Sequence, residues 1–362
     1  MIKVATVFSG IGAFEQALIK KNIDHEIVFA CDSGERYLED DLFNSLKDLD
    51  SSEKKKFVDA AYEQTKKTNY VKKSYFSNYN INGEQWHNDV RFLDTRNYKG
   101  KIDIFVGGSP CQSFSIIGKK AGLQDSRGTL FYEFARIVNE SQPKVFIYEN
   151  VTGLLNHDKG KTWKVIKDIF DSLNYNIYYD VLNSVNYGIP QNRKRVFVVG
   201  IRKDLHNKQF EFPEEQELTK NLDDYLEKNC DVDHLHYLGK KGFEFVTNPK
   251  YKNRARVNKK IIQTQKANQQ YNWNGDFVFV NVDEIINNNA IMERAYIGEY
   301  KGVKGAIRQL TNRECLRLMG FPDSFIINVP RQQSYRQAGN SIVVTIFESL
   351  IESVFKVVKF DE

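Results

Sequence analysis

The sequence predicts an α/β protein in which helices cover both faces of a mostly parallel β-sheet, with a smaller second domain. Two observations support this prediction. Short apolar runs alternate with helical stretches through about the first 200 residues, a pattern typical of strands and crossover helices in a parallel sheet. From about residue 205 to residue 305 the alternation fades and Asn, Lys and Tyr predominate, which indicates a separate module.

The individual elements follow from the same patterns. Buried strands are expected at residues 2–8, 26–31, 102–106, 144–148 and 196–201, and helices near residues 12–21, 130–139 and 161–173. Thr311, with Glu314 three residues later, forms a capping box that begins a helix ending near Gly320, and a last helix is expected over residues 342–357. Residues 39–73 carry eight acidic and eight basic side chains, which predicts an inserted, solvent-facing helical excursion.

The composition is that of an ordinary globular protein. Hydrophobic residues make up 41% and charged residues 27% of the 362 residues. No apolar run approaches the roughly 18 residues of a membrane span, and the chain starts directly in a strand without a signal-peptide pattern, so we expect a cytoplasmic protein. The four cysteines lie far apart without a CxxC pair, which argues against a disulfide framework and against a zinc site, and no bound metal is expected.

Positive charge is concentrated in the second module. Residues 236–270 contain nine Lys or Arg against one acid, a net charge of +8, beside Tyr251, Tyr271 and Trp273. A basic cluster is more often a solvated surface than a nucleic-acid site. Charge of this density next to aromatic side chains nevertheless favours nucleic-acid binding.

A glycine-containing turn follows the first strand. Gly10 and Gly12, after Phe8, permit tight backbone geometry and the close approach of a ligand at this strand-to-helix turn. Glu15 stands where the dinucleotide fingerprint has its third glycine. This disfavours a bound pyrophosphate, because the acid would face phosphate oxygens.

Two carboxylates extend this candidate site. Asp32 lies at the end of the second strand, where a carboxylate can accept hydrogen bonds from both ribose hydroxyls of an adenosine. Asp89 is placed to accept a hydrogen bond from an adenine amino group. Together they suit an adenosyl ligand without phosphates, and the alternative is a plain glycine turn beside surface acids.

A cysteine lies at the tip of another strand. Cys111 ends the run Gly-Gly-Ser-Pro-Cys directly after the strand at 102–106, at the sheet edge where parallel folds place their chemistry. Pro110 stiffens the backbone there. A lone cysteine is usually a small core residue, and a thiol of pKa about 8.5 is only a few per cent thiolate at neutral pH. A nucleophilic Cys111 therefore needs nearby cations or a reaction that draws negative charge away.

Polar groups that can supply such help accompany two later strands. Glu149 directly follows the strand at 144–148. Arg193 and Arg195 lead into the strand at 196–201, and strand alternation predicts that they point to the same face. Each feature alone is compatible with a capped helix or a surface cation pair, but four strand-edge signals in this order indicate an active site.

These motifs resemble those of the DNA cytosine carbon-5 methyltransferases of the prokaryotic or phage restriction-modification type. Six motifs stand in the family's order: the cofactor turn (8–12), the Pro-Cys-Gln loop (107–112), the Glu-Asn-Val element (149–151), the Gln-x-Arg-x-Arg element (191–195) and two closing motifs (313–323 and 337–341). The resemblance is closest over residues 103–205 and 310–348, and it lapses in 39–87 and 207–305.

The resemblance implies a Rossmann-like sheet that binds S-adenosylmethionine and a covalent mechanism. Cys111 would attack carbon 6 of a flipped-out cytosine, so that carbon 5 becomes nucleophilic. Glu149, with a raised pKa, would hydrogen-bond or protonate ring nitrogen 3. Arg195, with Arg193 as its neighbour, would hold the carbonyl at carbon 2 and favour the thiolate. The implied cofactor-binding residues are Phe8, Gly10, Gly12, Asp32, Asp89, Pro110, Asn340 and Ser341.

The resemblance also implies a division of the chain and a partner. Residues 1–205 and 331–362 would form the catalytic and cofactor-binding domain, with an insertion at about 39–87, and residues 206–330 the target-recognition domain. The partner would be duplex DNA, contacted through Gln112, Ser113, Ser115 and Arg127 of a closing loop and through Lys252, Arg254 and Arg256. The expected protein is a monomer away from membranes, and a cognate restriction endonuclease would share its DNA site without binding it.

Three alternatives stay open. An RNA cytosine-5 methyltransferase would use the same chemistry, although the basic module of about 100 residues favours duplex DNA. A nicotinamide oxidoreductase is disfavoured by Glu15 and by the Pro-Cys loop. A non-catalytic DNA-binding relative would have lost Cys111, Glu149 or the arginines, all of which are present.

Overall fold

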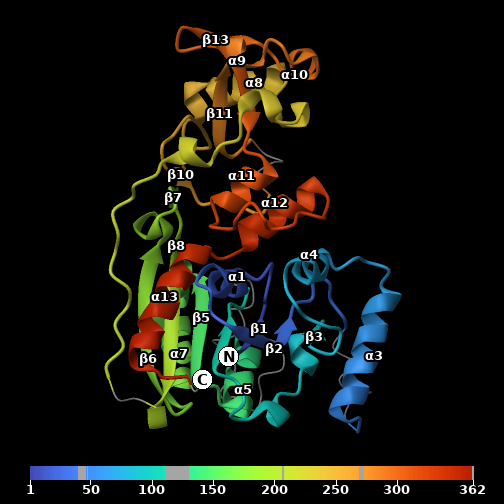
Figure 1. Cartoon of the computed structure of the whole chain (residues 1–362), viewed down its shortest axis with the longest axis vertical. Coiled ribbons are helices and arrows are strands. Elements are labelled where there is room, and N and C mark those ends of the chain that lie inside the picture. Colours follow the sequence, from blue (N-terminus) through green and yellow to red (C-terminus); the bar gives the residue numbers. More distant parts are fainter. Residues whose placement is uncertain (40–45, 47, 111–129, 206–207, 269–272, 361–362) are drawn as a thin grey trace. The chain divides into compact units, whose positions relative to one another are not determined.

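The computed structural model describes residues 1–362 except 40–45, 47, 111–129, 206–207, 269–272 and 361–362 (Figure 1). The chain divides into two compact units. The first comprises Met1–Leu182, Lys194–Glu214 and Ile346–Glu362, and the second comprises Asn183–Arg193 and Glu215–Thr345. This division differs from the boundaries expected at 205 and 331, because residues 183–193 and 331–345 group with the second unit.

A seven-stranded sheet forms the centre of the first unit. Its strands are, in spatial order, β3 (Trp86–His87), β2 (His25–Cys31), β1 (Ile2–Val7), β4 (Ile104–Gly107), β5 (Val145–Val151), β8 (Lys194–Arg202) and β6 (Tyr175–Asn183). The strands from β3 to β5 pair in parallel, whereas β8 runs antiparallel to β5. The strand order reverses between β1 and β4, and open α/β sheets bind ligands at such a switch point, outside the carboxyl ends of their strands.

Helices pack on both faces of this sheet. The described helices of the first unit are α1 (Ala13–Lys20), α3 (Ser51–Gln64), α4 (Tyr70–Asn78), α5 (Leu130–Ser141), α6 (Gly153–Asn156), α7 (Lys161–Asp171) and most of α13 (Val344–Val357). Strand β8 shows how the two faces arise, because its side chains alternate. Val196 and Val198 join the core cluster that includes residues of α5 and α7, whereas Phe197 packs against Phe347 of α13. The predicted α/β fold class is therefore confirmed.

The inserted segment forms the helices α3 and α4, as expected. The buried residues of these helices are Val58 and Tyr62 in α3 and Ser74 and Tyr75 in α4, so most of α3 faces solvent as predicted. The sequence analysis did not predict the buried stripe that the two helices also carry. The many charges of 39–73 occupy only part of each helix surface, and an apolar and aromatic stripe on the same helices is buried.

The second unit is built around a smaller sheet of four strands, β12 (Gly298–Tyr300), β13 (Val303–Gln309), β11 (Gly275–Asn281) and β9 (Ala255–Val257). A second, two-stranded sheet pairs β10 (Ile262–Gln263) with β7 (Gln191–Asn192). The helices are α8 (Lys240–Thr247), α9 (Val282–Ile285), α10 (Asn289–Arg294), α11 (Asn312–Arg317) and α12 (Arg331–Asn340). Helix α11 begins with the predicted capping box of Thr311 and Glu314.

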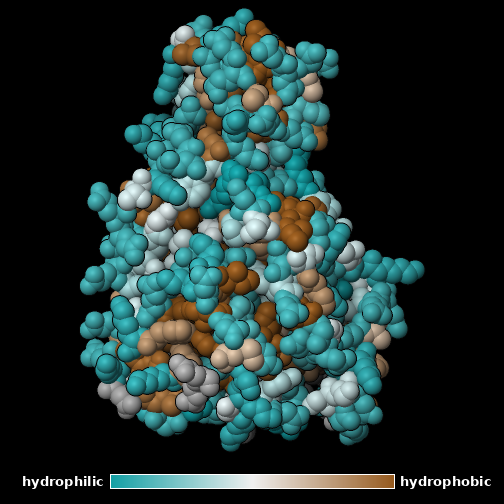
Figure 2. Space-filling view, in the orientation of Figure 1, coloured by the Kyte–Doolittle hydropathy of each residue, from teal (hydrophilic) through white to brown (hydrophobic). Residues whose placement is uncertain are grey.

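One stretch, Arg331–Val357, is long and apolar enough to cross a membrane by length and composition, although the sequence patterns predicted no span. Helix α12 ends at Asn340 before α13 begins at Val344, and 61% of the apolar window is buried in the protein. Phe347 packs on Phe14 and Phe197, so core packing accounts for this apolar character. The surface visible in Figure 2 is mostly hydrophilic, with apolar patches of limited extent.

Candidate active site

Most of the predicted site residues in the described part of the first unit lie at one edge of its sheet. The glycine turn follows β1, Asp32 follows β2, Asp89 follows β3, Pro110 follows β4, and Glu149 lies near the carboxyl end of β5. Because these five strands run parallel, their carboxyl ends share one edge. The topology therefore gathers side chains that are far apart in the sequence.

The turn after β1 is bonded to the turn after β2. The Asp32 carboxylate accepts hydrogen bonds from the Gly10 N–H at 2.9 Å and from the Gly34 N–H at 2.8 Å. Burial raises the pKa of Asp32, and the two backbone N–H groups oppose that rise. Gly10 has φ +53°, and a Cβ built on it would meet no atom closer than 4.0 Å. The turn therefore borders open space at Gly10, which fits the close approach of a ligand.

Asp89 is fully engaged by protein groups. It caps the short 3₁₀ helix η1 (Val90–Phe92), and its carboxylate accepts from the Arg91 backbone N–H at 3.0 Å. The Arg91 guanidinium donates to it from Nε at 3.0 Å and from a terminal nitrogen at 2.7 Å, and the Tyr62 hydroxyl donates to it at 2.8 Å, which makes four donors in all. A carboxylate has about four lone-pair sites, so Asp89 has none to spare in this arrangement. Its contact with an adenine amino group stays a prediction, and it requires one of these donors to move.

The loop that leads to Cys111 is tied to β5. The Asn150 side chain donates to the Ser109 carbonyl at 2.8 Å and to the Tyr148 hydroxyl at 2.9 Å, and the Ser109 and Tyr148 hydroxyls are 2.7 Å apart. Gly108 passes so close to Glu149 that a Cβ on it would lie 2.8 Å from the Glu149 carbonyl oxygen. The sequence prediction did not include this amide and hydroxyl network. The amide side chain of Asn150, next to Glu149 in the sequence, was the only sequence feature that could have indicated this network.

Glu149 and Arg195, which the sequence analysis assigned to one active site, form an ion pair. In the antiparallel register β5 residue Val151 pairs with Arg195, and the Arg195 Nε lies 3.0 Å from a Glu149 carboxylate oxygen. The side chains are 12% and 16% exposed, so the pair is mostly desolvated yet reachable from the sheet edge. The acid is thereby placed on β5, the strand beside β4, and the donor that fixes it lies on the next strand, β8.

Arg193 has a different environment, within the second unit. It precedes β8, and its guanidinium donates to the backbone carbonyls of Gln265 at 3.1 Å, Gly339 at 3.1 Å and Ser341 at 2.7 Å. The face that Arg193 was expected to share with Arg195 stays a prediction, because Arg193 itself lies just before the first residue of β8. These contacts tie three backbone segments together, and the catalytic role of Arg193 stays a prediction that they do not support.

The remaining predicted residues are distributed as follows. Cys111, Gln112, Ser113, Ser115 and Arg127 lie outside the described residues. Asn340 ends α12 and Ser341 is its C-cap, both in the second unit, so their cofactor contact stays a prediction. Their structural surroundings give no further support to it.

The basic side chains predicted to bind DNA differ in their exposure and in whether an acidic partner compensates their charge. Lys252 is exposed, and exposed Arg254 donates to the Asn274 side chain at 2.9 Å. Arg256 is partly buried and pairs with the carboxylate of Asp276 at 2.9 Å. Lys252 and Arg254 therefore present exposed positive charge, whereas the charge of Arg256 is largely compensated, and the contact of these residues with DNA stays a prediction.

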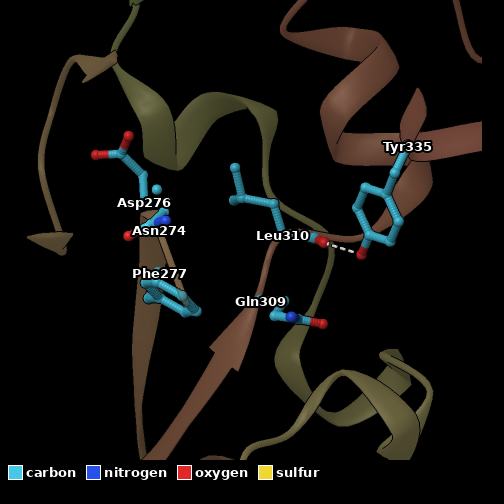
Figure 3. Close-up of a pocket in the computed structure, with 7 residues that line it drawn as sticks. Asn274, Asp276, Phe277, Gln309, Leu310 and Tyr335 are labelled. Atoms are coloured by element: carbon cyan, nitrogen blue, oxygen red, sulfur yellow. Dashed lines mark hydrogen bonds between the residues drawn. The ribbon is translucent and has the colours of Figure 1, made fainter. Parts of the chain in front are cut away.

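A small pocket in the second unit is not a binding site for a base or a cofactor. It lies between β11 and β13, where the Tyr335 hydroxyl donates to the Leu310 carbonyl (Figure 3). Its volume is about 10 Å³, room for about one water molecule. Asn274, Gly275, Asp276, Phe277, Gln309, Leu310 and Tyr335 line it.

Comparison with known proteins identifies the family of the chain. The model of the C-5 cytosine-specific DNA methylase family matches residues 2–356. The chain is 34% identical over 287 residues to the Type II methyltransferase M.HhaI of Haemophilus parahaemolyticus, covering 79% of this chain and 84% of that protein. It is 33% identical over 295 residues to the Type II methyltransferase M.SsoII of Shigella sonnei, covering 79% and 71%.

The fold also has solved counterparts. The crystal structure of the S. pombe Dnmt2 methyltransferase superposes with a TM-score of 0.65 at 19% identity, covering 98% of this chain and 99% of that one. At this identity the likeness concerns the fold alone. The family match and the relatives above 30% identity go further: the chain belongs to the family of C-5 cytosine-specific DNA methylases.

Proposed function

We propose that the chain transfers a methyl group from S-adenosylmethionine to carbon 5 of a cytosine within a specific duplex DNA sequence. Methylation of DNA cytosine at carbon 5 is the activity of its family. The observation that carries the proposal is the Glu149–Arg195 pair on β5 and β8, next to the strand whose loop leads to Cys111.

The turns after β1 and β2 fit the adenosyl part of the cofactor. Gly10 leaves open space, and Asp32 uses two of its roughly four lone-pair sites on Gly10 and Gly34. Two acceptor sites remain for the two hydroxyls of a ribose. S-adenosylmethionine supplies an electrophilic methyl group when bound, and the chain supplies the pocket and activates the base.

The protein activates cytosine through covalent addition. The target base leaves the DNA stack, at a cost of a few kcal/mol. The Cys111 thiolate forms a bond to carbon 6, and the electron pair of the carbon 5–carbon 6 double bond becomes available at carbon 5. Glu149 holds ring nitrogen 3 through a proton as charge develops there, and Arg195 keeps that carboxyl group in place. After methylation, loss of the carbon-5 proton expels the Cys111 thiolate and restores the ring.

A mechanism-based trap tests this proposal. DNA in which 5-fluorocytosine replaces cytosine is incubated with the protein and tritiated S-adenosylmethionine. Fluorine cannot leave as a proton does, so we expect a covalent protein–DNA adduct that survives denaturation. Cys111→Ser should form none, whereas Cys230→Ser, a change at an exposed cysteine, should match the wild type. Substantial methyl transfer by Cys111→Ala would refute the mechanism. Bisulfite sequencing of unmodified DNA after the reaction would identify the recognised sequence.

The RNA alternative is tested in the same assay. Structured RNA replaces DNA at equal cytosine concentration, and we expect tritium in DNA alone.

We also infer that the protein is a cytoplasmic monomer. A restriction endonuclease would act on the same DNA site without binding this protein. The support is the similarity to Type II methyltransferases. Light scattering of the purified protein should give the mass of one chain for the free protein and of one chain plus one duplex for the complex with DNA.

A further inference from the structure

Helix α4, from the inserted segment, is anchored at its start to the turn after β2. Its N-cap is Asn69, whose side-chain oxygen accepts from the Lys72 N–H at 2.9 Å. The amide nitrogen of the same side chain donates to the carbonyl of Asp32 at 3.0 Å. A Cβ on Gly34 would lie 2.2 Å from the Asn69 oxygen, so the helix start fits tightly against this turn.

The end of α4 is anchored to the turn after β1. Its C-cap is Tyr79, whose hydroxyl donates to the carbonyls of Ile11 at 2.9 Å and Gly12 at 2.6 Å. The Tyr79 ring lies against Gly12, where a Cβ would be 2.3 Å from a ring carbon. Gly12 has φ +76°, so both its backbone conformation and this contact require glycine.

A third contact joins the middle of α4 to helix α1. The Tyr75 hydroxyl donates to the carboxylate of Glu15, which also accepts from the Thr6 hydroxyl at 2.9 Å. Tyr75 is 0% exposed and Glu15 is 1% exposed. The Tyr75 and Tyr79 rings lie 4.6 Å apart, so the contacts at the middle and the end of the helix support one another.

We propose that α4 is a splint for the cofactor site, with Asn69 and Tyr79 as positioning residues that hold the turns after β2 and β1 in register. The inference rests on the proposed function. The two turns already share the hydrogen bond from Gly10 to Asp32, which sets the direction of the carboxylate. Because α4 fixes the backbone carbonyls on either side of that bond, it keeps the remaining Asp32 acceptor sites aimed at the ribose position.

The test removes each tether without removing the helix. Tyr79→Phe keeps the ring against Gly12 and deletes the hydroxyl. Asn69→Ser keeps an oxygen for the N-cap and deletes the amide donor to Asp32. Tyr179→Phe, a change at a 46% exposed tyrosine of β6, is the matched control. Calorimetry gives the Kd for S-adenosylmethionine and the binding stoichiometry, and hydrogen exchange of the free proteins follows the Gly10 and Gly12 amides.

Each tether variant should raise the Kd about two- to tenfold, as expected for the loss of one hydrogen bond, with unchanged stoichiometry. Exchange should accelerate at the Gly10 and Gly12 amides, while kcat at saturating cofactor and the KM for DNA stay within about twofold of wild type. A Kd and exchange like those of the control would overturn the inference and leave the proposed function standing. If the wild type bound no S-adenosylmethionine, both would fail.

Discussion

Glu149 has two separable properties, because it is both a partner for Arg195 and a group that can carry a proton. Glu149→Gln keeps an oxygen that can accept from the Arg195 Nε, but the amide cannot deliver a proton. We expect kcat to fall about 10²- to 10⁴-fold, the usual contribution of general acid–base catalysis. The Kd for S-adenosylmethionine should change by less than about twofold. Single-turnover kinetics and calorimetry measure the two quantities, with exposed Glu352→Gln as the control. Equal losses in both would assign Glu149 to cofactor binding instead.

Glu15 gives the folded protein a pH dependence. Burial raises the pKa of Glu15 above its ordinary value of 4.5, so the folded state favours the protonated carboxyl. Its stabilising contribution is full below that value and is lost as the pH rises through the folded-state pKa. Relative to Glu15→Gln, which stays neutral, the wild type should lose unfolding free energy as the pH rises above the ordinary glutamate value of 4.5. Urea unfolding at several pH values tests this, and two parallel pH profiles would contradict it.

The sequence predicted some site residues and missed others for physical reasons. Glu149 and Arg195 were recognisable because each lies at a strand end or start, and sheet register then brings them together. The hydrogen bonds of Arg193 to three distant backbone carbonyls were missed, because strand alternation says nothing about contacts made by a residue just outside a strand. The engagement of Asp89 depends on Tyr62, a residue 27 positions away, and no local pattern reports a contact of that kind.

Helix α11 begins with the capping box that the sequence predicted. The Thr311 hydroxyl accepts from the Glu314 N–H, and the Glu314 carboxylate accepts from the Thr311 N–H at 2.8 Å. Thr311→Ala should lower the unfolding free energy by about 0.5–2 kcal/mol, whereas Thr311→Ser keeps the cap and most of the stability. Chemical denaturation of both variants measures the difference. A serine variant as unstable as the alanine variant would show that the methyl group of Thr311, not the cap, is responsible.

The bounds of strands and long helices were predicted closely from the sequence, but the surfaces against which they pack were not. The strand expected at 26–31 is His25–Cys31, and the helix expected at 130–139 is Leu130–Ser141. Both have strong apolar periodicity, a pattern that can be read from residues close together in the sequence. For the inserted helices the charge count indicated a mostly exposed surface but not the buried stripe, because charge counts describe a helix surface on average. Whether a stripe such as Val58 and Tyr62 is buried depends on what the chain packs against it.

DNA affinity of the full protein should depend on salt through a few exposed side chains of the second unit. Lys252→Gln and Arg254→Gln should each weaken binding at every sequence and lower the slope of log K against log salt by about 1. Arg256→Gln should leave the slope nearly unchanged and destabilise the fold, because buried Asp276 loses its partner. Fluorescence anisotropy across a salt series gives the slopes. Three equal slope changes would mean that Arg256 also contacts a phosphate.

The contacts of Arg193 bear on how recognition could be re-engineered. The chain enters the second unit twice, once over Asn183–Arg193 and again over Glu215–Thr345. The three carbonyls that receive the Arg193 guanidinium all belong to the second passage. A chimaera that imports only residues 215–345 from a relative would join a host arginine to foreign acceptors. Grafts that also carry the short 183–193 passage keep donor and acceptors from one parent, and they should yield more soluble protein.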